Sequence, residues 1–199
     1  SELNKKYLRI VIATGLFHPD IGGPATYSKM LSDRLPEYGF LVKIVSFGAV
    51  RELPKVVRHL VYFFKVCRKA WGSDIIFAQD PVSVGLPAML VAKILRQKFI
   101  LKIVGDYAWE QHQARNQTVL LDEFQKGKYN FITELRRWVE YLVACQAEII
   151  ITPSEYLKKV VSGWGVKENV IKVVYNSFDI PEVVESKEEA RRKLNLSGF

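Results

Sequence analysis

The chain has 199 residues, of which 49% are hydrophobic and 25% charged, and this average composition excludes disordered, collagen-like and low-complexity proteins. Its net charge of +8 arises in the first half, because residues 1–105 carry 16 Lys and Arg against 7 Asp and Glu, whereas residues 106–199 carry 13 against 14. A basic half favours an anionic partner: a phosphorylated ligand, an acidic membrane surface or nucleic acid.

The two cysteines, Cys67 and Cys145, are far apart in sequence and form no CxxC pair. This usage favours a reducing compartment and argues against a zinc site built from cysteines. No apolar run approaches the ~20 residues that span a bilayer, and the first residues lack the apolar core of a signal peptide. We therefore expect a cytoplasmic chain.

The N-terminal part alternates strand and helix. A continuous apolar run predicts a strand over residues 8–14. Pro24 can open a helix that continues to about residue 38, and Gly39 is placed to end it. Residues 41–47 follow as a second strand. The residues expected to form the buried face of this helix are Tyr27, Leu31, Leu35 and Tyr38.

A longer helix is predicted over residues 54–71, and it is strongly basic. Its apolar positions are expected to pack on the sheet and its basic positions to face outward, as an amphipathic helix does. This basic surface predicts a peripheral contact with an anionic membrane. The predicted buried stripe is Val57, Leu60, Val61, Phe64, Cys67 and Trp71, and the basic positions are Lys55, Arg58, His59, Lys65, Arg68 and Lys69.

The rest of the chain continues the same alternation. Strands are predicted over residues 74–79, 98–104, 148–152 and 170–175, and helices over 86–96 and 131–147. Thr152 and Ser186 each begin a capping box, the second one opening a short helix that reaches Leu194. Residues 107–130 are irregular enough to predict a long loop or lid with some helix. In the helix over 131–147, the positions expected inward are Leu135, Trp138, Val139 and Leu142.

Six buried strands alternating with helices predict an α/β fold with a doubly wound, mostly parallel, Rossmann-like sheet. Ligands bind such sheets beyond the carboxyl ends of the strands. The positions there are the loop 15–23, Asp80, Gly105 and Asp106, the turn 152–155, and Asn176. We therefore expect the site at this edge.

The loop after the first strand contains Gly22 and Gly23 at the start of a helix. It is neither GxGxxG, which argues against a nicotinamide or flavin cofactor, nor a P-loop, which excludes P-loop hydrolysis, and no cofactor is expected. Without Cβ atoms, both glycines let backbone N–H groups approach an anion at a helix N-terminus. A plain turn that needs glycine is the competing interpretation.

Four ordered segments resemble family 4 retaining glycosyltransferases, which have the GT-B architecture of two Rossmann-like domains. The first is residues 17–25, directly after the first strand. The others are residues 102–110, which resemble the acceptor segment, residues 152–157, which resemble a "TPSEYL" turn, and residues 174–179, which resemble a "PNGVD" turn. Together they extend over nearly the whole chain.

The resemblance implies a transfer of sugar, with retention, from a UDP- or GDP-linked donor to a saccharide, lipid or small molecule. It places Gly22 and Gly23 at the donor diphosphate and Asp106 nearest the chemistry, although Asp106 could instead cap the following segment. The candidates for an acceptor pocket are His18, Tyr107 and Trp109. Asn176 and Asp179 are expected to shape the turn out of the domain.

Family members are about twice as long as this chain. The resemblance therefore implies an acceptor-side domain over residues 1–180 and a linker with a short helix over 181–199. Such a chain is expected to be inactive without a C-terminal domain. No Asp-x-Asp and no zinc-type spacing occurs, so no metal is expected.

Two other functions stay open. One is a non-catalytic α/β module that binds a phosphorylated ligand in the same crevice. The other is a nucleic-acid binder built on the basic helix, which we disfavour because its aromatic residues are predicted on or near the buried stripe. We expect no nucleic acid as a partner.

Overall fold

The computed structural model describes residues 7–115, 118–176 and 187–193. Within them, six parallel strands form one sheet in the order β2-β1-β3-β4-β5-β6. The predicted Rossmann-like α/β fold is therefore confirmed. The strands are β1 (Leu8–Thr14), β2 (Phe40–Ser46), β3 (Ile75–Ala78), β4 (Lys98–Lys102), β5 (Ile149–Thr152) and β6 (Ile171–Val173).

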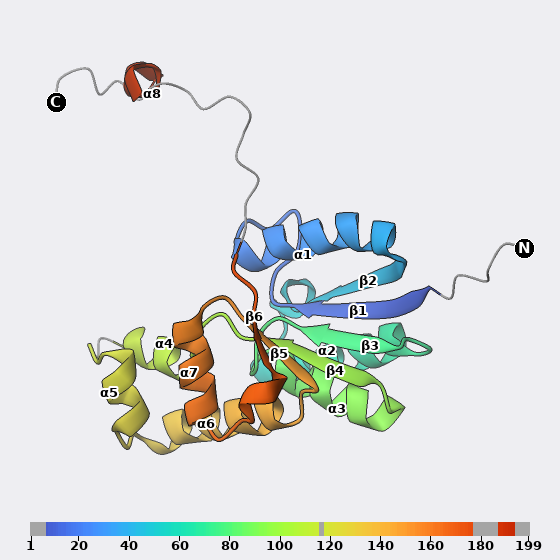
Figure 1. The fold of residues 1–199 in the computed structure, drawn as a ribbon. Helices are drawn as coiled ribbons and strands as arrows, with labels where there is room; N and C mark the ends of the chain where they lie inside the picture. Colours follow the sequence, from blue (N-terminus) through green and yellow to red (C-terminus); the bar gives the residue numbers. More distant parts are fainter. Residues whose placement is uncertain (1–6, 116–117, 177–186, 194–199) are drawn as a thin grey trace, which may run out of the picture.

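The helices divide between the two faces of the sheet (Figure 1). α1 packs on one face against Ile12, Phe77 and Ile100, while α2, α3, α6 and α7 form the large core on the other face. α4 and α5 follow the carboxyl end of β4. The bounds are α1 (Gly23–Arg34), α2 (Lys55–Ala70), α3 (Gly85–Leu95), α4 (Tyr107–Gln113), α5 (Leu121–Lys126), α6 (Phe131–Cys145), α7 (Glu155–Gly163) and α8 (Lys187–Lys193).

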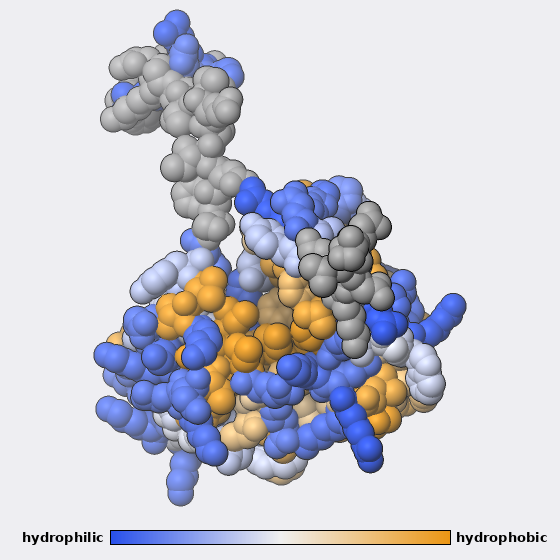
Figure 2. All heavy atoms as spheres, turned by 45° about the vertical axis from the view of Figure 1, so that its right-hand side comes forward, coloured by the Kyte–Doolittle hydropathy of each residue, from blue (hydrophilic) through white to orange (hydrophobic). Residues whose placement is uncertain are grey.

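The α1 face is thinly covered, and part of it stays exposed. Ile149 and Val174 belong to this face by strand alternation, and their side chains are 38% and 49% exposed. Figure 2 shows apolar side chains gathered around a hollow below α1. The sheet therefore offers an open surface beside α1 along its later strands, from Ile149 at the amino end of β5 to Val174 just past β6.

The predicted buried stripe of α2 is wrong in part, since only Val61 and Cys67 of its residues pack against the core. Leu60, Phe64 and Trp71 are 57%, 66% and 74% exposed, and Val57 is 43% exposed. The helix instead packs through its other apolar stripe, in which Tyr62, Val66 and Ala70 are fully buried. The Tyr62 hydroxyl donates to the Val45 carbonyl at 2.9 Å, which joins this helix to β2.

Part of the predicted burial on two other helices is also wrong. Tyr38 is 76% exposed, because α1 ends at Arg34 and a 3-10 helix runs from Leu35 to Tyr38. Gly39 stops it with a φ of 84°, as predicted. On α6, the predicted inward residues Leu135 and Trp138 are 45% and 56% exposed, whereas Val139 and Leu142 do pack against the core.

The irregular segment and the capping boxes also differ in detail. In residues 107–130, predicted as a long loop or lid with some helix, the helical parts are α4 and α5. The cap of α7 lies two residues later than predicted, because Ser154, not Thr152, accepts the capping hydrogen bond, from the Leu157 N–H. α8 matches the predicted charged helix, while its predicted cap at Ser186 and the domain boundary at residue 180 lie outside the described residues. Within the described ranges, no helix is long and apolar enough to cross a bilayer.

Candidate functional site

A crevice of about 510 Å³ lies at the carboxyl ends of the strands on the α1 face. It is bounded by the first turns of α1, by the ends of β3 and β4, and by the segment after β6. This is the edge where a doubly wound sheet binds ligands. The lining residues are Gly23, Pro24, Thr26, Tyr27, Met30, Gln79, Lys102, Val104, Val174, Tyr175 and Asn176.

Lys102 is the cation of this crevice. Lys102 stands two residues after Ile100 on β4, so the two side chains lie on the same face of the sheet, the one that α1 covers. Only 4% of Lys102 is exposed there. Its Nζ lies 3.1 Å from the centroid of the Tyr27 ring and 3.4 Å from Oδ1 of Asn176. Burial lowers the pKa of Lys102 to about 8. Within the part of the chain that the structure describes, no carboxylate pairs with this ammonium group.

The N-terminus of α1 meets the same crevice. Gly22 is the N-cap and provides no capping side chain, the first turn holds no acidic residue, and Pro24 has no N–H to donate. The first-turn amide of Thr26 bonds to the Gly22 carbonyl, and Gly23 itself lines the crevice. A Cβ added to Gly23 would meet nothing within 4 Å, so this backbone is open to an incoming group.

A buried polar chain fixes this N-terminus against the sheet. Nε2 of Gln79 donates to the Ser28 hydroxyl at 2.8 Å, and the Ser28 hydroxyl donates to the Pro24 carbonyl at 2.7 Å. The Thr14 hydroxyl lies 3.4 Å from Oε1 of Gln79. The ends of β1 and β3 thereby hold the first turn of α1 in place.

Asp106 lies outside the crevice lining, at the start of α4. Its Oδ1 accepts from the Trp109 N–H at 2.8 Å, its Oδ2 accepts from Nε2 of Gln125 at 2.7 Å, and only 2% of the residue is exposed. Burial raises the pKa of Asp106, and these two hydrogen bonds oppose that rise. The described role of the side chain is therefore to cap α4, and its role in catalysis stays a prediction.

A second buried carboxyl group supports the same helix end. Oε1 and Oε2 of Glu140 accept from the backbone N–H groups of Tyr107 and Ala108, at 2.6 and 3.3 Å. Burial, together with the nearby charge of Asp106, raises the pKa of Glu140 to about 9. At neutral pH the Glu140 carboxyl is thus protonated, and α6 holds α4 through a neutral acid.

The three predicted acceptor residues do not meet at the crevice. His18 is exposed in the loop after β1, and Tyr107 and Trp109 are half-buried on α4. The Trp109 indole donates to the Val119 carbonyl at 2.8 Å. None of the three is among the residues that line the crevice, so their acceptor roles remain predictions.

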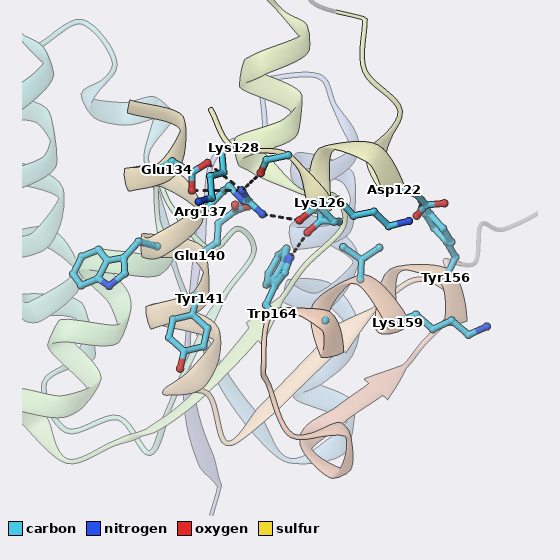
Figure 3. A pocket seen from close by; sticks show the side chains of 15 residues that line it. Asp122, Lys126, Lys128, Glu134, Arg137, Glu140, Tyr141, Tyr156, Lys159 and Trp164 are labelled. Atoms are coloured by element: carbon cyan, nitrogen blue, oxygen red, sulfur yellow. Dashed lines mark hydrogen bonds and ion pairs between the residues drawn. The ribbon is translucent and has the colours of Figure 1, made fainter. Parts of the chain in front are cut away.

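A larger pocket of about 1020 Å³ opens between α5, α6 and α7 (Figure 3). Its central cation, Arg137, already donates to the carbonyls of Gly127 and Gln125 and to the Glu134 carboxylate. The Trp164 indole donates to Oε1 of Gln125, the same residue that reaches Asp106. Arg137 is thus held by contacts within the protein, but Lys126, Lys128 and Lys159 also line this pocket and make its wall basic.

Sequence reasoning missed Lys102 and underrated Asn176. Lys102 stands inside an apolar run, where the pattern predicts only a strand residue. Asn176 follows the last predicted strand, where it is expected to shape a turn. The available signal was the alternation along β4, which places residue 102 on one face at the carboxyl end. Among the described residues, no group of three or more His, Cys, Asp or Glu side chains could hold a metal ion.

Solved structures share this fold at low sequence identity. HepE from Anabaena, in complex with UDP and glucose, gives a TM-score of 0.60 at 13% identity over 96% of this chain and 51% of HepE. Sucrose-phosphate synthase from Thermosynechococcus elongatus gives 0.67 at 15% over 94% and 52%. UDP-GlcNAc 2-epimerase from Methanocaldococcus jannaschii gives 0.53 at 16% over 84% and 45%. The chain thus spans about half the length of these proteins.

The sequence comparison identifies the family. No curated protein sequence matches the chain significantly. The family model described as Glycosyltransferase Family 4, however, matches residues 21–181, from the N-terminus of α1 past the end of β6. With the GT-B fold shared by HepE and sucrose-phosphate synthase, the match shows that this chain belongs to Glycosyltransferase Family 4 as an N-terminal domain.

Proposed function

We propose that the chain is the acceptor-side domain of an enzyme that moves a sugar from a nucleotide-sugar, UDP- or GDP-linked, to an acceptor with retention. The observation that carries the proposal is the buried, carboxylate-free Lys102 beside the open N-terminus of α1. Both features attract an anion at the edge where the fold binds ligands. HepE, with the same fold, was solved with UDP-glucose, which supports a donor of this class.

In this proposal the crevice stabilises the diphosphate of the leaving nucleotide. The Lys102 ammonium and the Gly23 N–H are cationic or dipolar donors that need no metal, and the Gln79 network holds the first turn of α1 before the donor arrives. Gly22 supports this geometry at a φ of 154°, which side chains rarely adopt. Preorganised donors aimed at developing charge are an effective means of lowering a barrier.

The acceptor, a saccharide, lipid or small molecule, would lie between the crevice and α4. His18, Tyr107 and Trp109 stay proposed acceptor contacts, and Asp106 is proposed to act near the chemistry, either directly or by positioning α4. The proposal includes a peripheral contact with an anionic membrane on the cytoplasmic side.

A second domain is part of the proposal, because the matched structures are about twice as long as this chain. We expect residues 1–180 to fold alone and residues 181–199 to lead toward that domain. Positioning of two reactants can contribute ~7–11 kcal/mol to catalysis, and a lysine and a helix N-terminus cannot fix base, ribose and sugar together. Transfer is therefore expected only from the two-domain protein.

The competing function is a non-catalytic module that binds a phosphorylated ligand in the same crevice. Isothermal titration of the two-domain protein with UDP, GDP and their glucose conjugates, followed by an assay for transferred sugar, separates the two. Nucleotide-sugar binding with transfer supports the enzyme. Binding of simple phosphorylated compounds with no transfer to saccharide or lipid acceptors would support the module.

A further inference from the structure

α2 carries an exposed apolar stripe on the side that faces away from the sheet. Val57, Leu60, Phe64 and Trp71 recur at helical spacing on one side of α2, and each is between 43% and 74% exposed. The opposite stripe already anchors α2 in the core through Tyr62, Val66 and Ala70. The outward stripe is therefore not needed to hold the helix on the sheet.

The neighbouring helices extend this apolar surface. α3 packs beside α2, and the Gln97 side chain donates to the Ala70 carbonyl, which joins the ends of the two helices. α6 packs beside α3 on the same face. The exposed apolar side chains on these two helices are Leu90 and Ile94 of α3 and Phe131, Ile132, Leu135 and Trp138 of α6. We call the outward surface of α2, α3 and α6 the three-helix face.

The charge around the three-helix face has one sign over α2 and α3. Residues 53–73 and 81–105 contain no Asp or Glu, so neither helix carries an acidic side chain. Arg58, Lys65, Arg68 and Lys69 stand on α2, and Lys93 and Arg96 stand at the end of α3. An apolar surface next to uncompensated cations is complementary to the acyl boundary and headgroups of an anionic bilayer.

We infer that the three-helix face docks the protein on an anionic lipid bilayer, with Leu60, Phe64 and Trp71 entering the interface and the cations of α2 meeting lipid headgroups. This inference rests on the peripheral membrane contact proposed above and deepens it, because it moves the contact from basic side chains alone to apolar insertion across three helices. α2 has 16 residues and is about 24 Å long, so it lies along the surface. Trp71 at its end suits the interface, where tryptophan is enriched.

The docked orientation has a consequence for the crevice. The three-helix face is on the side of the sheet opposite to α1, so docking covers neither Tyr27 nor Lys102. α6 begins toward the carboxyl edge of the sheet (Figure 1) and contacts α4, the helix that follows β4. A bound protein would thus keep its donor crevice open to water while its edge stays close to the lipid surface.

Co-sedimentation with vesicles tests the inference. Vesicles of phosphatidylcholine alone are compared with vesicles of two parts phosphatidylcholine and one part phosphatidylglycerol. The double substitution Phe64→Ser with Trp71→Ser should lower the partition coefficient on anionic vesicles by about tenfold or more, since it removes two large apolar side chains from the interface. Tyr38→Ser is the matched control, because Tyr38 is equally exposed at 76% but lies beside α1.

A second variant separates the electrostatic part of the contact. Lys65→Gln with Arg68→Gln should weaken binding at low salt and leave little difference at high salt, whereas Lys167→Gln, an exposed site elsewhere, should have no effect. UDP affinity measured without vesicles should be unchanged in every variant. If the wild-type protein does not bind UDP, this result counts against the proposed donor site and not against the three-helix face.

Several outcomes would overturn the inference. Full binding by the Phe64→Ser, Trp71→Ser variant would show that the membrane contact lies elsewhere. Equal co-sedimentation of the wild-type protein with neutral and with anionic vesicles would exclude the proposed contact with anionic lipid. A concentration-dependent dimer that this variant abolishes would assign the face to a second copy, and salt-sensitive binding of duplex DNA would assign it to nucleic acid.

Discussion

Lys102 carries a charge where its surroundings disfavour one, and this makes donor binding depend on pH. Its pKa is about 8 in the folded protein, below its ordinary value, because burial penalises the ammonium form. An anionic ligand binds the protonated form, so affinity should fall as pH rises through about 8. We expect the dissociation constant for UDP to increase up to about tenfold between about pH 7 and about pH 9, measured by isothermal titration of the two-domain protein.

The matched pair Lys102→Met and Lys98→Met tests the assignment to Lys102. Both lysines stand on β4 and on the same face, but Lys98 is exposed at the amino end. Lys102→Met should weaken UDP binding by about tenfold or more and remove its pH dependence, since a charged hydrogen bond is worth ~1.5–3 kcal/mol. Equal affinities of the two variants would exclude a contact between Lys102 and the diphosphate.

Gly23 tests the backbone part of the same site. The space at Gly23 is open, so Gly23→Val should leave the melting temperature nearly unchanged and raise the donor dissociation constant sharply. Gly163→Ala, at a glycine with equally open surroundings on α7, controls for the loss of a glycine. A lower melting temperature with unaltered affinity would assign Gly23 to the turn.

Asp106 has two proposed roles that one substitution separates. Asparagine caps helices about as well as aspartate, so Asp106→Asn should keep α4 folded. If the carboxylate only positions α4, kcat of the two-domain enzyme should fall less than about tenfold. A loss of ~10²-fold or more at an unchanged melting temperature would instead give the carboxylate a direct part in proton transfer.

At the scale of elements, the contact between α6 and α4 makes stability depend on pH. The pKa of Glu140 is raised to about 9, so its contribution is fully present below its unfolded pKa near 4.5 and is lost as pH rises toward 9. Glu140→Gln keeps an oxygen for the Tyr107 N–H but cannot ionise. The variant should therefore melt higher than the wild type at about pH 9, by roughly 2–4 °C per kcal/mol, with no such gain near pH 5.

Thermal melts across this pH range check the assignment, with Glu148→Gln, an exposed carboxyl, as control. A parallel loss of stability with pH in the wild type and the Glu140→Gln variant would show that another group is responsible.

The helices also show where sequence patterns are decisive and where they fail. The order of strands and helices followed from alternating apolar runs, and Gly39 ended its helix as predicted. α2, however, has two apolar stripes, and periodicity cannot say which one packs. The spacing predicts the stripe with Phe64 and Trp71 inward, but the stripe with Val66 and Ala70 is the one that packs in the core.

At the scale of the whole molecule, topology brought together what the sequence kept apart. Parallel strands end at one edge, so the prediction that the site lies there places Gly23 and Asn176 correctly in one crevice. The same argument included Asp106, whose side chain turns inward because the N-terminus of α4 needs a cap. Strand ends are thus predictable from sequence. The direction of each side chain, however, depends on tertiary packing, which the pattern of apolar residues does not reveal.

The central claim is that this domain holds the diphosphate of a nucleotide-sugar during glycosyl transfer by a two-domain enzyme. The most direct test is a transfer assay with labelled UDP- and GDP-sugars and a panel of saccharide and lipid acceptors. It compares the 199-residue chain, the two-domain protein and its Lys102→Met variant. We expect the two-domain protein to form a product with retained anomeric configuration. At limiting donor, the Lys102→Met variant should form about tenfold less product, and the isolated chain should form none. Robust turnover by the isolated chain, or full turnover by the Lys102→Met variant, would contradict the central claim.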